Sequence, residues 1–487
     1  MKKSITSILG LAKWQSRVLG GALLLSLPMF LTSCEDILGK WDKPTPVNVI
    51  VTPDDNGGGT YLVWDATAKQ LKSEALPTTF TKMDASQTTW SGTYIVEDDV
   101  EITSDVTLSG DATIIIKDGK TLSLASDKKI EYIDATAYKL NIHAQSDGAS
   151  AGKLVVSTTS DGTYPIALNG SLSIYGASVS TTATGAGNEG LYVADELNVY
   201  GGEIKSTATG AGIMVGNTLG TVNIYGGTVD AKKTGNVATS AIYVYGNMNI
   251  YNGTVKGTVT GFGSGISVAA ASASSGILTI ENGTVTGISS YNMKGINATT
   301  INITGGTVNA ECGAGGCVIQ CTTLNISGAD TKVTATGGDG NSTILDAGYG
   351  IMGTVNIDGG DVTVSGGNGA KGTATNINGG FGGNGISGNV KVSGTATVKV
   401  TGGRGGDGYD ADGGTGGPGG NGIFGKLDNA SPNVTVTGGN GGDAGSRTSA
   451  GTNNGGTGAS AISGAKTGTA PTTTNGTNGS NKSLSSL

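Results

Sequence analysis

The chain has 487 residues, 88 of them glycine, which is about 18% against about 7% in an average protein. Apolar residues reach 36% and charged residues only 14%, too apolar for a solvated disordered chain, and a single histidine leaves little metal or acid–base chemistry. The formal net charge of −8 becomes −12 without residues 1–33, which hold four basic and no acidic residues, so a nucleic-acid partner is disfavoured. Glycine does not recur at every third position as collagen requires.

Residues 1–33 are predicted to be a lipoprotein signal peptide. Basic residues open the chain, an apolar run covers 18–31, and the sequence Leu-Thr-Ser precedes Cys34. The run is shorter than a typical membrane span and is typical of a cleaved export signal. Its end resembles the lipobox of bacterial lipoproteins, which implies lipidation of Cys34. The alternative is an uncleaved anchor, and under either interpretation the chain is tethered outside the cytoplasm.

Residues 34–60 are expected to form a flexible stalk. Glu35 and Asp36 resemble the export signal of surface lipoproteins in Bacteroidota-type bacteria. This resemblance implies attachment to outer-membrane lipid through Cys34, facing the cell exterior. The rest of the segment holds several prolines and a run of Asp, Asn and Gly at 54–59, without apolar periodicity.

A repeat of about 25 residues dominates the rest of the chain. Residues 222–229 read Val-Asn-Ile-Tyr-Gly-Gly-Thr-Val, and related units precede and follow. Apolar and polar residues alternate, as in a strand with one buried face, and Gly-Gly allows a sharp bend. One coil cannot bury its apolar side chains alone, so the repeat predicts a right-handed parallel β-helix of about 10 to 13 coils, with three short strands per coil. The predicted inward anchors are Ile174, Val199, Ile224, Ile250, Ile280, Ile303, Ile326, Ile357, Val392 and Val434.

The repeat predicts the domain boundaries. Residues 61–110 are expected to form an amino-terminal cap, with 61–89 either extending that cap or forming a separate strand pair. Residues 111–465 are expected to form the β-helix, whose inserted loops become glycine-rich after 366. Residues 466–487 lack apolar anchors and are expected to be a disordered tail.

The repeat resembles two groups of proteins. Its Leu-Asn-Ile-Tyr-Gly-Gly-Thr-Val units, and the opening Trp-x-Gly-x-Tyr-x-Val-x-x-Asp-Val-x-Ile at 90–102, are similar to β-solenoid surface lipoproteins of Bacteroidota. More distantly the chain resembles β-helical carbohydrate-binding domains that share a fold with pectate lyases. This second resemblance implies a polysaccharide ligand and calcium, and it is specific for the fold rather than for the ligand.

Two columns of outward side chains are the main candidate ligand site. They flank the inward anchors, so stacked coils would align them about 4.8 Å apart. Exposed aromatic rings beside amide groups suit the apolar faces and hydroxyl rims of sugars. The alternative is that like residues stack for stability alone, and the two explanations are compatible. The candidate residues are Tyr175, Tyr200, Tyr225, Tyr251, Asn198, Asn223 and Asn249.

A calcium site is a further hypothesis. Residues 402–410 fit the calcium-binding nonapeptide Gly-Gly-x-Gly-x-Asp-x-U-x, and an incomplete copy begins at Gly438. Asp407, Asp410 and Asp412 would offer carboxylate oxygens to Ca²⁺. Glycine spacing alone is the alternative explanation for the match.

The cysteines and the histidine suggest no catalytic centre. Cys312, Cys317 and Cys321 lack the fourth ligand of a zinc site; they are expected to be buried, although Cys312 and Cys317 could form a disulfide. His143 is expected to occupy an outward strand position that tyrosine takes in later coils.

The sequence therefore predicts a non-catalytic, monomeric surface lipoprotein that binds polysaccharide or host glycan, or mediates adhesion. One alternative is a polysaccharide lyase or hydrolase, although acidic residues do not fall at matching positions of neighbouring coils. The other alternative is a surface spacer or adhesin without a glycan ligand.

Overall fold

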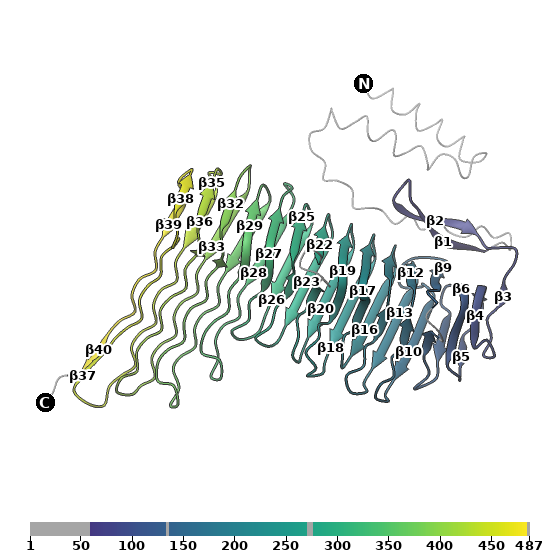
Figure 1. Ribbon diagram of the computed structural model, residues 1–487, viewed down its shortest axis with the longest axis horizontal. Helices are drawn as coiled ribbons and strands as arrows, with labels where there is room; N and C mark the ends of the chain where they lie inside the picture. The colour runs from purple at the N-terminus through teal and green to yellow at the C-terminus, as the bar shows by residue number, and fades with distance from the viewer. Residues whose placement is uncertain (1–58, 133–135, 270–275, 485–487) are drawn as a thin grey trace, which may run out of the picture. The chain divides into compact units, whose positions relative to one another are not determined.

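The computed structural model describes residues 59–132, 136–269 and 276–484, with the backbone alone at 217 and 218. Its coils are stacked in chain order, and strands pair in parallel with their equivalents in the next coil (Figure 1). The chain folds as the predicted parallel β-helix. The described residues include no helix long and apolar enough to cross a membrane.

Two long parallel sheets carry the stack. The 14-stranded sheet takes one strand from each coil: β5 (Val100–Ile102), β7 (Thr121–Leu124), β10 (Lys153–Thr158), β13 (Ser178–Ala183), β16 (Glu203–Ala208), β18 (Thr228–Lys233), β20 (Thr254–Val259), β23 (Thr284–Ser289), β26 (Thr307–Glu311), β28 (Lys332–Thr336), β30 (Asp361–Ser365), β33 (Thr397–Thr401), β36 (Val434–Thr437) and β39 (Thr472–Thr474). The 22-stranded sheet takes the remaining strands of the coils: β3 (Thr81–Lys82), β4 (Thr89–Val96), β6 (Val106–Ile116), β8 (Ile130–Tyr132), β9 (Lys139–Ala144), β11 (Ile166–Leu168), β12 (Ser171–Tyr175), β14 (Leu191–Val193), β15 (Glu196–Val199), β17 (Ile213–Ile224), β19 (Ile242–Ile250), β21 (Ile266–Ala269), β22 (Ile277–Ile280), β24 (Ile296–Ala298), β25 (Thr300–Ile303), β27 (Ile319–Ile326), β29 (Ile351–Ile357), β31 (Ile386–Ser387), β32 (Val390–Val392), β34 (Ile423–Phe424), β35 (Leu427–Asn429) and β38 (Lys466–Gly468).

Two antiparallel pairs lie outside these sheets. The amino-terminal hairpin joins β1 (Thr60–Asp65) to β2 (Gln70–Ala75). The second pair joins β37 (Gly451–Asn453) to β40 (Lys482–Leu484).

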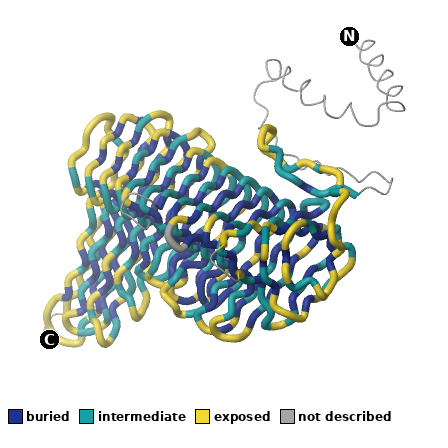
Figure 2. Tube along the Cα trace, turned by 45° about the vertical axis from the view of Figure 1, so that its right-hand side comes forward, coloured by how far each residue is buried: buried dark blue, intermediate teal, exposed yellow. Residues whose placement is uncertain are grey.

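Apolar side chains fill the inside of the coils. Buried residues recur along each coil of the stack (Figure 2). In β19, the alternation of Ile242, Val244, Met248 and Ile250 leaves each of these residues no more than 1% exposed. Burying such a side chain contributes about 1.5–3 kcal/mol. Stacking repeats this burial in every coil, as the sequence period predicts.

The inward anchors are in register from Ile174 to Val392. The last predicted anchor, Val434, is wrong, because it lies in β36 of the 14-stranded sheet. Asn429 follows Val392 in the row instead, and its buried side-chain amide donates to two backbone carbonyls. A satisfied polar residue can thus take an anchor position without an apolar signal in the sequence.

The predicted cap boundary is also wrong. The coil stack already begins with β3 and β4, since β4 pairs in parallel with β6 and β5 with β7. Met83 and Trp90 are fully buried in this first part of the core. Residues 60–75 form a separate strand pair, one of the two possibilities that the sequence left open.

The glycine-rich loops are ordered arms that pair with one another, and together they form what we call the glycine wing (Figure 1). In Gly402-Gly403-Arg404, the backbone amide of Gly402 donates to a backbone carbonyl of the next coil. The backbone amide of Gly403 donates to a backbone carbonyl of the opposite arm. The backbone amide of Arg404 donates to the Asn368 side-chain oxygen, and all three distances are 2.8–2.9 Å. This period of three is that of a polyproline II helix, whose amides all point outward. The wing consists of residues 337–349, 366–385, 402–422, 438–461 and 475–481.

Glycine is required in the wing because the arms approach one another backbone to backbone. A Cβ atom on Gly403 would overlap the carbonyl oxygen of Gly367, and one on Gly442 would overlap that of Gly406. Glycine therefore does recur with a period of three in this part of the chain, as Gly-Gly-x rather than as the collagen repeat.

The expected disordered tail is instead the last described coil. β38 and β39 pair in parallel with β35 and β36, which gives 14 coils, one more than the predicted range. Three asparagine side-chain oxygens, spaced three residues apart, then accept the amides of the preceding arm at 2.8–2.9 Å. Apolar anchors are not needed here, because these hydrogen bonds order the backbone. The three residues, which we call the asparagine cap, are Asn475, Asn478 and Asn481.

Candidate functional site

The predicted column of aromatic rings is present on the outside of the 22-stranded sheet. Parallel pairing that is in register around the inward anchors places equivalent positions side by side. The rings of Tyr175, Tyr200, Tyr225 and Tyr251 stack with centroids 4.7–4.8 Å apart. His143 continues the column, 4.1 Å from Tyr175, at the outward position expected for it. The stacking is confirmed, and the ligand-binding role stays a prediction.

The predicted asparagine column is a ladder of mutual hydrogen bonds. The Asn223 amide donates to Asn198 and the Asn249 amide to Asn223, both at 2.9 Å. Asn198 and Asn223 are buried, and Asn249 is half-buried. After an interruption the same row continues through Asn302, Asn325 and Asn356. Their amide groups largely satisfy one another and are less available to a ligand than the sequence suggested.

The amino-terminal hairpin covers the middle of the aromatic column. Trp64 packs on Tyr200 and Tyr225, with ring centroids 4.9 and 5.0 Å away. Tyr61 packs edge-on against His143 at 5.1 Å. The described hairpin residues make no ring contact with Tyr251. Among the four tyrosines, Tyr175 and Tyr251 thus lack a ring contact with the described hairpin, and Tyr251 lies at the end of the column.

One hydrogen bond fixes the hairpin to the column. The Nδ1 atom of His143 lies 2.6 Å from the carbonyl oxygen of Leu62, which acts as acceptor. Burial lowers the pKa of His143 to about 4, although this hydrogen bond acts in the opposite direction. His143 is therefore neutral at pH 7, and Nδ1 carries the proton in this contact. Sequence reasoning missed the role of Trp64, although Trp64 ends a short apolar run from Tyr61 that is compatible with a strand.

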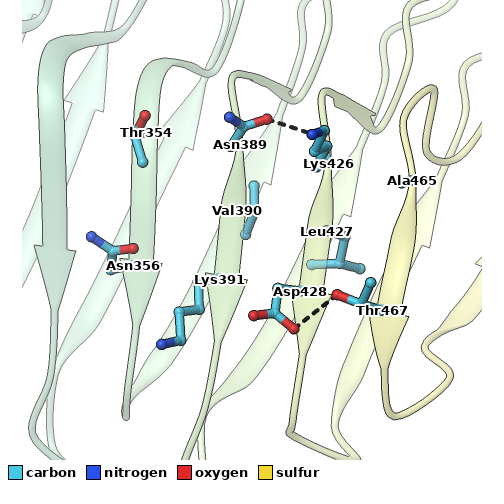
Figure 3. Close-up of a pocket in the computed structure, with 10 residues that line it drawn as sticks. All are labelled: Thr354, Asn356, Asn389, Val390, Lys391, Lys426, Leu427, Asp428, Ala465 and Thr467. Carbon is cyan, nitrogen blue, oxygen red and sulfur yellow. Dashed lines mark hydrogen bonds between the residues drawn. The ribbon is translucent and has the colours of Figure 1, made fainter.

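A hollow of about 260 Å³ lies further along the outward face of the same sheet, across β29, β32, β35 and β38 (Figure 3). Its outward row continues the asparagine ladder in register, as Asn356, Lys391, Asp428 and Thr467. The sequence analysis did not single out this row. The feature of the sequence that could have revealed this row is the replacement of asparagine by charged residues at a fixed strand position.

Two hydrogen bonds join neighbouring strands within the hollow. The Asn389 side-chain oxygen accepts the Lys426 backbone amide at 3.1 Å, and Asp428 accepts the Thr467 hydroxyl at 2.9 Å (Figure 3). The exposed ammonium groups of Lys391 and Lys426 have no hydrogen bond or ion pair with any described residue. The hollow thus presents two free cationic donors.

The three candidate calcium ligands are held apart by other partners. Asp407 accepts the Asp443 backbone amide at 2.8 Å, Asp410 that of Ser446 at 3.0 Å, and Asp412 binds the amides of two residues in the next arm. No group of three or more metal-ligating residues occurs among the described ranges. Acidic or amide side chains recur here because they satisfy the third amide of each triplet, which accounts for the match to the nonapeptide.

The three described cysteines are free thiols within the coils. Burial raises the pKa of Cys312, Cys317 and Cys321 to about 12, so each is protonated at pH 7. The Cys312 thiol donates to the Gly316 carbonyl at 2.7 Å. Cys321 is buried, as expected, whereas Cys312 and Cys317 are half-buried.

The predicted signal peptide, the predicted stalk up to residue 58 and the predicted lipidation site Cys34 lie outside the described residues. Comparison with protein-family models, curated proteins and solved structures yields no match for the chain. The fold class is therefore defined by the coordinates alone as a parallel β-helix with a glycine wing.

Proposed function

We propose that the chain is a non-catalytic surface protein that binds polysaccharide, or mediates adhesion to it, on the outward face of its 22-stranded sheet. The hollow is the observation that carries this proposal. Two lysines, two asparagines, two threonines and Asp428 line it beside three apolar residues, and the polar groups of such side chains pair with sugar hydroxyls. Tyr251, at the uncovered end of the aromatic column, offers a ring for the apolar face of a sugar.

The leader sequence supports the location of this activity. A lipid on Cys34 would hold the β-helix at the outer membrane, facing the exterior. A polysaccharide lying across several coils would then meet successive strands about 4.8 Å apart.

A glycan array with the full chain in detergent micelles tests the proposal. Ala465 lines the hollow, so Ala465→Trp should fill it and weaken binding at least tenfold. Ala430→Trp is the matched control, because Ala430 is exposed next to β35 but outside the hollow. Equal loss in both variants would contradict a site in the hollow, and absence of binding to any glycan would favour the spacer.

A second candidate is a lyase-like enzyme, because the hollow holds lysine amines beside the carboxylate of Asp428. A lyase needs a proton acceptor near an acidic sugar and releases an unsaturated product. Ultraviolet absorbance of uronate polysaccharide incubated with the chain distinguishes the two. A rise in absorbance that is lost in the Lys391→Ala variant would favour the lyase proposal over the binding proposal.

A further inference from the structure

We propose that the hollow recognises an anionic group on a saccharide, either the carboxylate of a uronic acid or a sulfate ester. This inference rests on the proposed function and names its ligand class. The residues that line the hollow carry it, because the ammonium groups of its two lysines have no partner among the described residues.

The first step is the balance of donors and acceptors. The Asn389 oxygen and one Asp428 oxygen already accept hydrogen bonds from neighbouring strands. The Asn356 amide donates back along the ladder to Asn325 at 2.9 Å. What remains for a ligand is dominated by the ammonium groups of Lys391 and Lys426, so the ligand must bring acceptors.

The second step is local charge. Lys391 and Lys426 lie on adjacent strands, β32 and the approach to β35, and Asp428 is the one carboxylate that lines the hollow. The hollow therefore has a net positive charge on a chain whose formal net charge is −8. At physiological ionic strength charges beyond about 8 Å are largely screened, so the lysines outweigh the distant acidic residues.

The third step concerns the kind of anion. Lysine ammonium groups act as point charges with freely rotating donors, and they do not require the planar geometry that arginine recognises. Both a planar carboxylate and a tetrahedral sulfate therefore suit them. The hydroxyls of Thr354 and Thr467 and the Asn389 amide are placed for the sugar hydroxyls around the anion (Figure 3).

Calorimetric titration of the full chain tests the inference with three probes of equal length. They are a uronic-acid oligosaccharide, its neutral methyl ester, and a sulfated oligosaccharide. We expect an acidic probe to bind at least about tenfold more tightly than the ester and to weaken as salt is added. Preference for the carboxylate or for the sulfate identifies the source of the anion.

Paired variants localise the effect. Lys391→Gln with Lys426→Gln should abolish the preference for the acidic probe, whereas arginine at both positions should retain it. Lys332→Gln with Lys399→Gln is the control, since these lysines are exposed on the 14-stranded sheet and their replacement removes the same charge. Circular dichroism confirms that each variant is folded.

The outcomes separate the two proposals. Equal binding of the ester and the acidic probes would overturn the anionic inference and leave polysaccharide binding standing. Loss of the preference in the control pair would also overturn it, by assigning the effect to overall charge. No binding of any probe, together with a blank glycan array, would overturn both.

Discussion

The apolar coils and the glycine wing stack in the same direction but are held by opposite means. In the coils, inward side chains such as Ile224 exclude water, and the strands need a side chain at every second position. In the wing, much of the backbone itself is buried (Figure 2), and arms such as 402–408 need the absence of side chains at two of every three positions. The comparison teaches that one chain can order successive parts of a solenoid by apolar burial and by backbone hydrogen bonds.

The largest expected effect is a cavity in the coils. Ile224 is fully buried between Val199 and Ile250, so Ile224→Ala should lower the free energy of unfolding by about 2–5 kcal/mol. Urea denaturation followed by circular dichroism measures this change in the free energy of unfolding. Lys205→Ala, an outward substitution in β16, should change stability by less than about 0.5 kcal/mol. Similar costs for the two variants would remove the distinction between inner and outer faces.

Acid should loosen the two regions in different pH ranges. The folded pKa of His143 is about 4 against an ordinary 6.5, so stability is complete above pH 6.5 and falls as pH drops toward 4. The loss should reach about 3 kcal/mol, given about 1.4 kcal/mol per pKa unit, and should appear as undocking of the hairpin. In the wing, hydrogen bonds from Ser449 and Thr448 lower the pKa of Asp412 to about 2. The contribution of Asp412 to stability should persist until the pH falls below 3.8, the ordinary pKa of an aspartate.

Hydrogen exchange, corrected for intrinsic rates, measures both transitions. Amides of β1 should open between pH 6.5 and 4, and those around Thr448 only below 3.8. His143→Phe keeps the ring in the column and should abolish the first transition. Opening of both regions in the same pH range would show that one shared event controls them.

The smallest effect distinguishes the wing from an ordinary loop. Gly403→Ala would place a Cβ atom against the Gly367 carbonyl, and the forced separation should cost about 1–3 kcal/mol locally. Hydrogen exchange should rise in neighbouring arms and stay constant in β17. Thr457→Ala, at an exposed position of another arm, is the control. Unchanged exchange in Gly403→Ala would mean that the arms do not need close approach.

The sequence predicted those features that repeat locally. The anchor alternation and the tyrosine spacing sufficed for the coils and the aromatic column, because parallel pairing brings equivalent positions together. The docking of Trp64 onto Tyr200 was not predictable in this way, since it joins segments far apart in the chain. The wing was missed for another reason: backbone-to-backbone pairing leaves no apolar pattern, only Gly-Gly-x triplets that resemble loops.

The candidate site divides along the same lines. The rings of the aromatic column and the amides of the asparagine ladder were found because each recurs from coil to coil. Lys391 and Asp428 break the recurrence, so a search for repeats passes over them although their register is fixed by the same strands. Exposure of the hollow depends on neighbouring side chains, which spacing alone does not specify.

The asparagine cap occupies backbone amides at the last described coil of the stack. An end of the stack whose backbone groups are unpaired could act as a template. Another molecule could add to it, end to end, and form a filament. Asn475, Asn478 and Asn481 use their own side chains to occupy the arm amides that such growth would require. Three short polar residues thus withdraw three backbone donors of this arm from end-to-end pairing.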